Sequence, residues 1–165
     1  MDKYRRLLVA VRDRPRTARV LKLVDIFAVL FTVIFYVAAL ILVSLSDLLV
    51  AVRLGIICAV PFVIVSLVRR WINAPRPYEV YSDIYEVAPK SRAGASFPSR
   101  HAFSVFAIGT ELLFVYPMPA VAVLILGVLL SVSRVLLGKH FVRDVLAGAL
   151  LGALTSLIGI LILYF

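Results

Sequence analysis

Residues 23–68 read LVDIFAVLFTVIFYVAALILVSLSDLLVAVRLGIICAVPFVIVSLV, two long apolar runs separated by Ser46 and Asp47. A helix needs roughly 20 apolar residues to cross a hydrocarbon core of about 30 Å, and the runs 23–45 and 48–68 are both long enough. Hydrophobic residues occupy 63% of the 165 positions, and the mean hydropathy is +1.06. Because this apolar share exceeds that of an ordinary soluble domain, the sequence predicts an integral membrane protein.

Three more apolar segments follow, which makes five predicted spans in an all-α, polytopic transmembrane helical bundle; the later three are 101–116, 118–137 and 142–165. Pro98 and Ser99 are expected to cap the third span, because serine commonly caps a helix start and proline is tolerated there. Gly148 and Gly152 in the last span are expected to let another helix pack closely.

The first 22 residues are basic, and Leu7, Leu8 and Val11 recur there at helical spacing. This pattern predicts an amphipathic helix that lies at the membrane interface and is broken near Pro15. The chain therefore divides into a basic interfacial segment, residues 1–22, and a membrane domain, residues 23–165.

Basic residues are concentrated at one end of the predicted bundle. Of 18 Lys and Arg residues, 17 lie in three regions that five spans place on one face, namely 1–22, 69–100 and 133–143. By the positive-inside rule this face is cytoplasmic. Nine of the 17 belong to loops with possible phosphate-binding motifs, so the inference depends on the eight in residues 1–22.

Arg69, Arg70 and Arg76 form the first of three polar clusters, where the second span ends. A guanidinium group suits phosphate because its planar fork donates paired hydrogen bonds and stays charged at any working pH. Taken alone, Arg69 and Arg70 are better explained as an ordinary basic flank of a membrane helix.

The second cluster, SFPSRH at residues 96–101, opens the third span. Amide groups at a helix start are unpaired, so Ser99, Arg100 and His101 could hold an anion with backbone as well as side-chain groups. The alternatives are a simple cap for Ser99 and an interfacial position for His101.

The third cluster, SRVLLGKHFVRD at residues 133–144, places His140 and Asp144 four residues apart, on one face of a helix. A carboxylate bonded to one ring nitrogen fixes the tautomer and leaves the other nitrogen free to attack phosphorus. The alternative is a salt bridge or a cap at a helix start. Because both histidines of the chain lie beside arginines on the same face, we favour the catalytic interpretation.

Together these clusters resemble the three-part signature of the type 2 phosphatidic acid phosphatase superfamily, which reads K-x6-R-P, then P-S-G-H, then S-R-x5-H-x3-D. The parts occur in order and at the expected spacing, and the matching residues are Arg69 with Arg76-Pro77, then Pro98 to His101, then Ser133-Arg134 with His140 and Asp144. The chain is similar to compact bacterial-type members, and the family's helical core would cover nearly all of it after residue 22.

Two residues depart from that signature. Arg69 stands where the family has Lys, which keeps the positive charge, and Arg100 replaces Gly where the family's backbone approaches phosphate closely. Arg100 could contact a second phosphate or turn toward lipid headgroups. The family fold also has six spans rather than five, and many bacterial members face outward, which is opposite to the orientation that the charges favour here.

The resemblance implies a phosphatase that works through a phosphohistidine. His140 would attack phosphorus, Asp144 would orient it, and His101 would protonate the departing alkoxide and then activate water. The phosphate oxygens would be held by the remaining matched side chains, namely Arg69, Arg76, Ser99, Arg100 and Arg134. No cofactor is implied, and no spacing of His and carboxylate residues in the site-side loops is typical of a metal site.

The predicted function is hydrolysis of a lipid phosphate monoester or diphosphate, of the phosphatidate, phosphatidylglycerol phosphate or polyprenyl diphosphate type, by a multi-pass protein of the cell membrane. Two alternatives stay open: a phosphotransferase that passes the phosphoryl group to an alcohol other than water, and a non-catalytic protein that binds anionic lipid. The predicted partners are the substrate and membrane lipids, with no nucleic acid, and the oligomeric state is left open.

Overall fold

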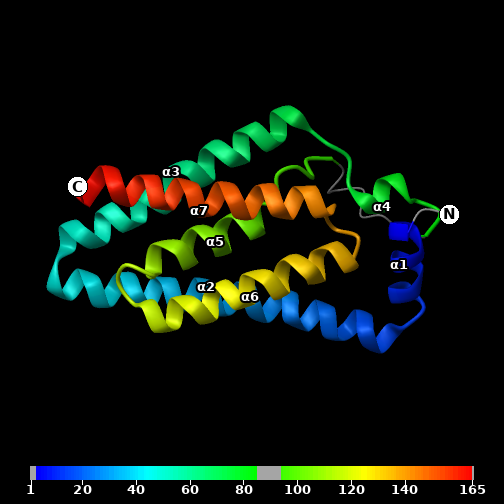
Figure 1. Cartoon of the computed structure of the whole chain (residues 1–165), viewed down its shortest axis with the longest axis horizontal. Coiled ribbons are helices and arrows are strands. Elements are labelled where there is room, and N and C mark those ends of the chain that lie inside the picture. Colours follow the sequence, from blue (N-terminus) through cyan, green and yellow to red (C-terminus); the bar gives the residue numbers. More distant parts are fainter. Residues whose placement is uncertain (1–2, 85–93, 165) are drawn as a thin grey trace.

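In the computed structural model the described residues are 3–84 and 94–164, and within them the chain forms seven helices and no strand. This confirms the all-α prediction. Figure 1 shows the longer helices running side by side, with the two ends of the chain at opposite ends of the bundle. The helices are α1 Lys3–Arg12, α2 Pro15–Ser46, α3 Leu48–Ile72, α4 Pro77–Val80, α5 Arg100–Leu112, α6 Pro117–Leu136 and α7 Val142–Tyr164.

Four helices among the described residues, α2, α3, α6 and α7, are long and apolar enough to cross a membrane. They correspond to four of the five predicted spans. Their outer faces carry large apolar side chains such as Ile34, which is 67% exposed, and a hydrocarbon surrounding would cover such a surface. Helix α2 begins at Pro15, so residues 15–22 extend this helix before the predicted start of the first span at residue 23.

The third predicted span, 101–116, is shorter in the structure than the sequence indicated. Helix α5 has 13 residues and ends at Leu112, so at 1.5 Å per residue it rises only about 20 Å. Residues 113–115 form a turn, and Tyr116 N donates to Leu112 O at 2.7 Å before Pro117 opens α6. The apolar run simply continues beyond the helix. Most of α5 is buried against neighbouring helices, so it does not need the length of a lipid-facing span.

Helices α5 and α7 cross at very close range, as the two glycines of the last span predicted. A Cβ atom at Gly148 would clash with the carbonyl oxygen of Ser99, and one at Gly152 would clash with that of Phe103. Ser99 N also donates to the main-chain oxygen of Asp144 at 2.9 Å. This crossing therefore sets the distance between the start of α5 and the start of α7.

The first helix lies across one end of the bundle. It ends at Arg12 and α2 starts at Pro15, which confirms the predicted break. Leu8 is only 1% exposed, and the Tyr4 hydroxyl donates to Val135 O at the end of α6, at 2.9 Å. Arg5 pairs with Asp83 in the turn that follows α4. Helix α1 therefore ties the segment after α4 to the turn between α6 and α7.

The three segments that carry the motifs meet at this same end. In Figure 1, α1, α4 and the turn from α6 to α7 lie at one end of the bundle, and α5 begins deeper in the bundle with its start directed toward that end. The turns from α2 to α3 and from α5 to α6 lie at the other end. This arrangement confirms the prediction that the amino-terminal segment and all three motifs share one face.

Candidate active site

His140 and Asp144 are both buried where α7 begins, with 1% and 0% of their side chains exposed. His140 Nδ1 lies 3.6 Å from Asp144 Oδ2, which is too long for a hydrogen bond. The Ser96 hydroxyl contacts both side chains, 2.6 Å from Asp144 Oδ2 and 3.3 Å from His140 Nδ1. Phe141 N also donates to Asp144 Oδ2, at 2.9 Å. Since Nδ1 of His140 is the ring nitrogen near this carboxylate, Nε2 faces away from it.

His101 lies against Arg134, whose Nη1 is 2.8 Å from His101 Nδ1. A guanidinium group can only donate, so His101 Nδ1 accepts, and the proton of the neutral ring sits on Nε2. Arg134 is held from its other side by Asp25 on α2, with 2.7 Å between Asp25 Oδ1 and Arg134 Nε. Lys139 Nζ lies 2.6 Å from Asp25 Oδ2. One buried carboxylate therefore holds two cations at the site.

Two further arginines are oriented by main-chain oxygens of the segment before α5. Arg69 is 5% exposed and its Nη1 donates to Pro98 O at 3.2 Å. Arg76 Nε donates to Gly94 O at 3.1 Å. Each of these contacts uses one N–H group of a guanidinium that carries five, so others stay available for an anion.

Ser99 and Arg100 behave differently from the expectation of an anion cradle. Ser99 is the cap of α5, as one reading of the sequence predicted: its hydroxyl accepts from Ala102 N at 3.5 Å. Its amide donates to Asp144 O, so the Ser99 amide is not free for phosphate. The Arg100 guanidinium lies over the ring of Phe62 on α3, 6.0 Å from the ring centroid, at the outer limit of a cation–π contact.

The electrostatics of the site favour an anion and a neutral His140. Burial lowers the pKa of His140 below its ordinary value of 6.5, and nearby Arg76, Arg134 and Arg69 act in the same direction, against the opposite effect of Asp144. Loss of solvation disfavours the charged ring, and like charges add to that effect. His140 is therefore neutral at neutral pH. Within the described ranges, no group of three or more His, Cys, Asp or Glu residues is placed to hold a metal ion.

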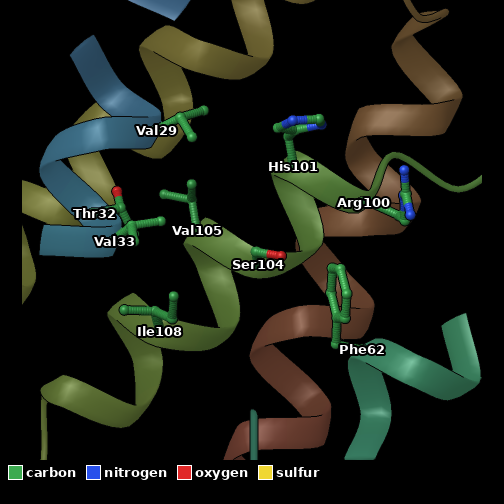
Figure 2. Close-up of a pocket in the computed structure, with 9 residues that line it drawn as sticks. All are labelled: Val29, Thr32, Val33, Phe62, Arg100, His101, Ser104, Val105 and Ile108. Atoms are coloured by element: carbon green, nitrogen blue, oxygen red, sulfur yellow. The ribbon is translucent and has the colours of Figure 1, made fainter. Parts of the chain in front are cut away.

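An apolar groove leads away from His101 and Arg100 (Figure 2). It has a volume of about 240 Å³ and lies between α2, α3 and α5. Figure 2 shows Arg100 and His101 at one end, with the apolar side chains of Val33 and Ile108 farther along. A hydrocarbon chain would fit such a surface, because little on it is polar except at the end where the two basic side chains lie.

All eight predicted site residues lie at this end of the bundle, although they come from five segments. Two residues that the sequence analysis gave no role also belong here, Ser96 and Asp25. Ser96 is the first residue of the second cluster, SFPSRH, two residues before Pro98. Its place in that cluster could have identified it as a site residue. Asp25 is a carboxylate inside an apolar run, which in membrane proteins indicates a functional position. The sequence does not indicate which residue it pairs with.

The chain is similar to known proteins in sequence. The model of the PAP2 superfamily matches residues 47–165. A lipid A 1-phosphatase of Rhizobium johnstonii is 33% identical over 96 residues, covering 56% of this chain and 39% of that protein. An undecaprenyl-diphosphatase of Sulfolobus acidocaldarius is 34% identical over 113 residues, covering 66% of this chain and 54% of that protein. The chain therefore spans only about two fifths to half of the length of these relatives.

Two solved structures share the fold, each at 20% sequence identity. The PAP2-type phosphatidylglycerolphosphate phosphatase of Bacillus subtilis has a TM-score of 0.66, covering 96% of this chain and 85% of that one. LpxE of Aquifex aeolicus has a TM-score of 0.67, covering 94% of this chain and 93% of that one. The family model covers well over half of the chain, and the chain forms a multi-pass membrane protein that belongs to the PAP2 superfamily.

Proposed function

We propose that this chain is a membrane phosphatase that removes a terminal phosphate from a lipid phosphate monoester or diphosphate. One observation carries the proposal: Arg100 and His101 line one end of an apolar groove. His140 and three further arginines lie close to this pair. Such a site suits a molecule with a phosphate at headgroup depth and a hydrocarbon tail. The names of the curated relatives, for a lipid A phosphate and an undecaprenyl diphosphate, support the same substrate class.

In the first step of the proposed reaction, Nε2 of His140 attacks phosphorus and the bond from phosphorus to the bridging oxygen breaks. The products are a phosphohistidine and a departing lipid alcohol, or a departing lipid monophosphate when the substrate is a diphosphate. Burial and three arginines keep His140 neutral, so its lone pair is available. Arg69, Arg76 and Arg134 would stabilise the charge on the equatorial oxygens, which persists through phosphoryl transfer.

His101 is proposed to supply the proton that the departing alkoxide needs. In the free site the Arg134 contact leaves Nδ1 of His101 as an acceptor, so the ring must gain a proton before it can act as an acid. A bound phosphate would favour this protonation, because it carries about 1.5 to 2 negative charges. It would attract Arg134 and would also stabilise a second proton on the His101 ring. Substrate binding and activation of the acid are thereby linked.

In the second step a water molecule attacks the phosphohistidine. His101, now neutral again, accepts the proton of the water, the bond from phosphorus to nitrogen breaks, and inorganic phosphate leaves. His140 returns with its lone pair on Nε2. No step in this scheme calls for a metal ion.

The test is phosphate release by the purified protein in detergent, on a panel of a phosphatidate, a phosphatidylglycerol phosphate and a polyprenyl diphosphate. The proposal expects inorganic phosphate and the dephosphorylated lipid in equal amounts, with and without EDTA. A dephosphorylated lipid without matching phosphate would identify a phosphotransferase instead. Binding without turnover on every lipid would indicate a non-catalytic lipid-binding protein.

We further propose that the site faces the cytoplasm. Eight basic residues within positions 1–22, against two acidic residues, lie at the end of the bundle where the motifs gather. The positive-inside rule places such a segment on the cytoplasmic side. Helix α1 belongs to this segment and packs on the motif end through Tyr4 and Leu8, so the charge and the site share one face.

A further inference from the structure

The Ser96 hydroxyl lies beside the candidate nucleophile and its carboxylate and contacts both of them. Its oxygen is 2.6 Å from Asp144 Oδ2 and 3.3 Å from His140 Nδ1, whereas those two atoms are 3.6 Å apart. Ser96 is completely buried, so no bulk water competes for these contacts. The hydrogen-bonded connection from His140 to Asp144 therefore runs through Ser96, beside the longer direct contact between the two side chains.

The proton of this hydroxyl can be assigned from the contacts. A distance of 2.6 Å is typical of a hydroxyl that donates to a carboxylate, and Asp144 Oδ2 also accepts from Phe141 N. A serine hydroxyl has one proton. Because Asp144 receives it, Ser96 Oγ can only accept from His140 Nδ1. His140 then carries its proton on Nδ1, and the lone pair of Nε2 is free.

Ser96 does not depend on His140 for its own position. Ser96 N donates to Ala74 O at 2.8 Å, and Arg69 donates to Pro98 O two residues later. Gly94 N, two residues before, donates to Glu79 Oε1 at 2.7 Å. The main chain around Ser96 is thus fixed on both sides by residues between the end of α3 and α4, which can hold the hydroxyl in place for His140.

We propose that Ser96 is a positioning residue that transmits the orienting effect of Asp144 to His140 by a relay from His140 Nδ1–H to Ser96 Oγ–H to Asp144 Oδ2. The proposal rests on the proposed function, in which His140 Nε2 is the nucleophile. Ser96 touches no substrate in this scheme. Its hydroxyl selects the tautomer of His140 and the plane of its ring.

The kinetic test is Ser96→Ala, with Ser156→Ala as the matched control because Ser156 is also completely buried but lies twelve residues beyond Asp144 on α7. We expect Ser96→Ala to lower kcat by at least roughly tenfold, as expected for loss of a hydrogen bond to a charged group. KM should stay the same, because the arginines are untouched. Ser96→Thr, which keeps the hydroxyl, should recover most of the kcat. Wild-type kcat in Ser96→Ala would overturn the relay.

The spectroscopic test does not depend on activity. Nitrogen-15 NMR of the imidazoles distinguishes the two tautomers, and the chain has only two histidines, so the His101→Gln variant leaves the signals of His140 alone. We expect the proton of neutral His140 on Nδ1. A proton on Nε2 would overturn the relay. If the wild-type protein is inactive but His140 carries its proton on Nδ1, the proposed function is contradicted and the relay is still supported.

Discussion

Asp25 on α2 and Arg134 at the end of α6 form a buried ion pair, although 109 residues separate them in the sequence. Their side chains are 6% and 9% exposed, and Asp25 Oδ1 lies 2.7 Å from Arg134 Nε. Arg134 in turn contacts His101. Asp25 lies outside residues 47–165, which the family model matches. A helix that precedes the matched region thus positions an arginine of the family signature.

Asp25→Asn should weaken substrate binding more than chemistry. The change keeps the shape but removes the charge that holds Arg134, and a hydrogen bond to a charged group is worth about 1.5 to 3 kcal/mol. We expect KM for a lipid phosphate to rise on the order of tenfold, with a smaller change in kcat. Asp13→Asn is the control, since Asp13 pairs with Arg12 at the surface. Equal kinetics for the two variants would show that Asp25 does not position Arg134.

The sequence was sufficient for the features that depend on local pattern. The apolar runs predicted the four long helices, the proline at position 15 predicted the break after α1, and the motif spacing predicted which arginines and histidines gather. The exception is α5, where the apolar residues 113–116 continue past the end of the helix. Hydropathy cannot place a helix end when the turn that ends it is also apolar.

The contacts that complete the site could not be predicted, because they join distant segments. Nothing in the local pattern around Asp25 names Arg134 or Lys139 as its partner. Ser96 is 44 residues from His140, and its contacts with the ring and with Asp144 follow from how the segment before α5 packs on the start of α7. The position of Ser99 at a helix start predicts an amide that is free for an anion, but in the structure this amide donates to Asp144 O.

His101→Ala should discriminate between leaving groups. General acid catalysis typically raises the rate a hundredfold or more. We therefore expect His101→Ala to lower kcat on a lipid monoester by about a hundredfold or more. The loss on a lipid diphosphate should be clearly smaller, because a phosphate leaves without needing a proton as an alkoxide does. The measurement is the ratio of the two kcat values in wild type and variant. Equal losses on both substrates would remove His101 from the acid role.

Arg100→Gly, which restores the family's motif, should change the preference between substrates. Arg100 and His101 line the same end of the groove, on the side where the leaving group would sit, so the second phosphate of a diphosphate would meet the Arg100 guanidinium. We expect kcat/KM to fall about tenfold more for the diphosphate than for the monophosphate, as for loss of one charged hydrogen bond. Phe62→Leu, which removes only the ring beneath Arg100, is the control. An unchanged ratio in Arg100→Gly would assign this side chain to headgroup or structural contacts.

The orientation of the site can be measured with two matched serines. Ser82, in the turn after α4, and Ser46, at the opposite end of the bundle, are both exposed. Each is changed to Cys in a Cys58→Ser background, which removes the native thiol, and intact cells are treated with a membrane-impermeant thiol reagent. The charge argument predicts that Ser46→Cys is labelled and Ser82→Cys is protected until the cells are opened. The reverse pattern would place the site on the outer face.

The central claim is that His140 carries the phosphoryl group, and trapping that intermediate tests it most directly. Purified protein is mixed with a lipid phosphate labelled on phosphorus, quenched in alkali within the first turnover, and mapped by mass spectrometry. We predict that His140 is labelled in the wild type. In His140→Ala we predict no labelled residue and a rate of phosphate release below about a hundredth of the wild-type rate. Label on another residue, or a His140→Ala protein that keeps releasing phosphate above that level, would contradict the assignment.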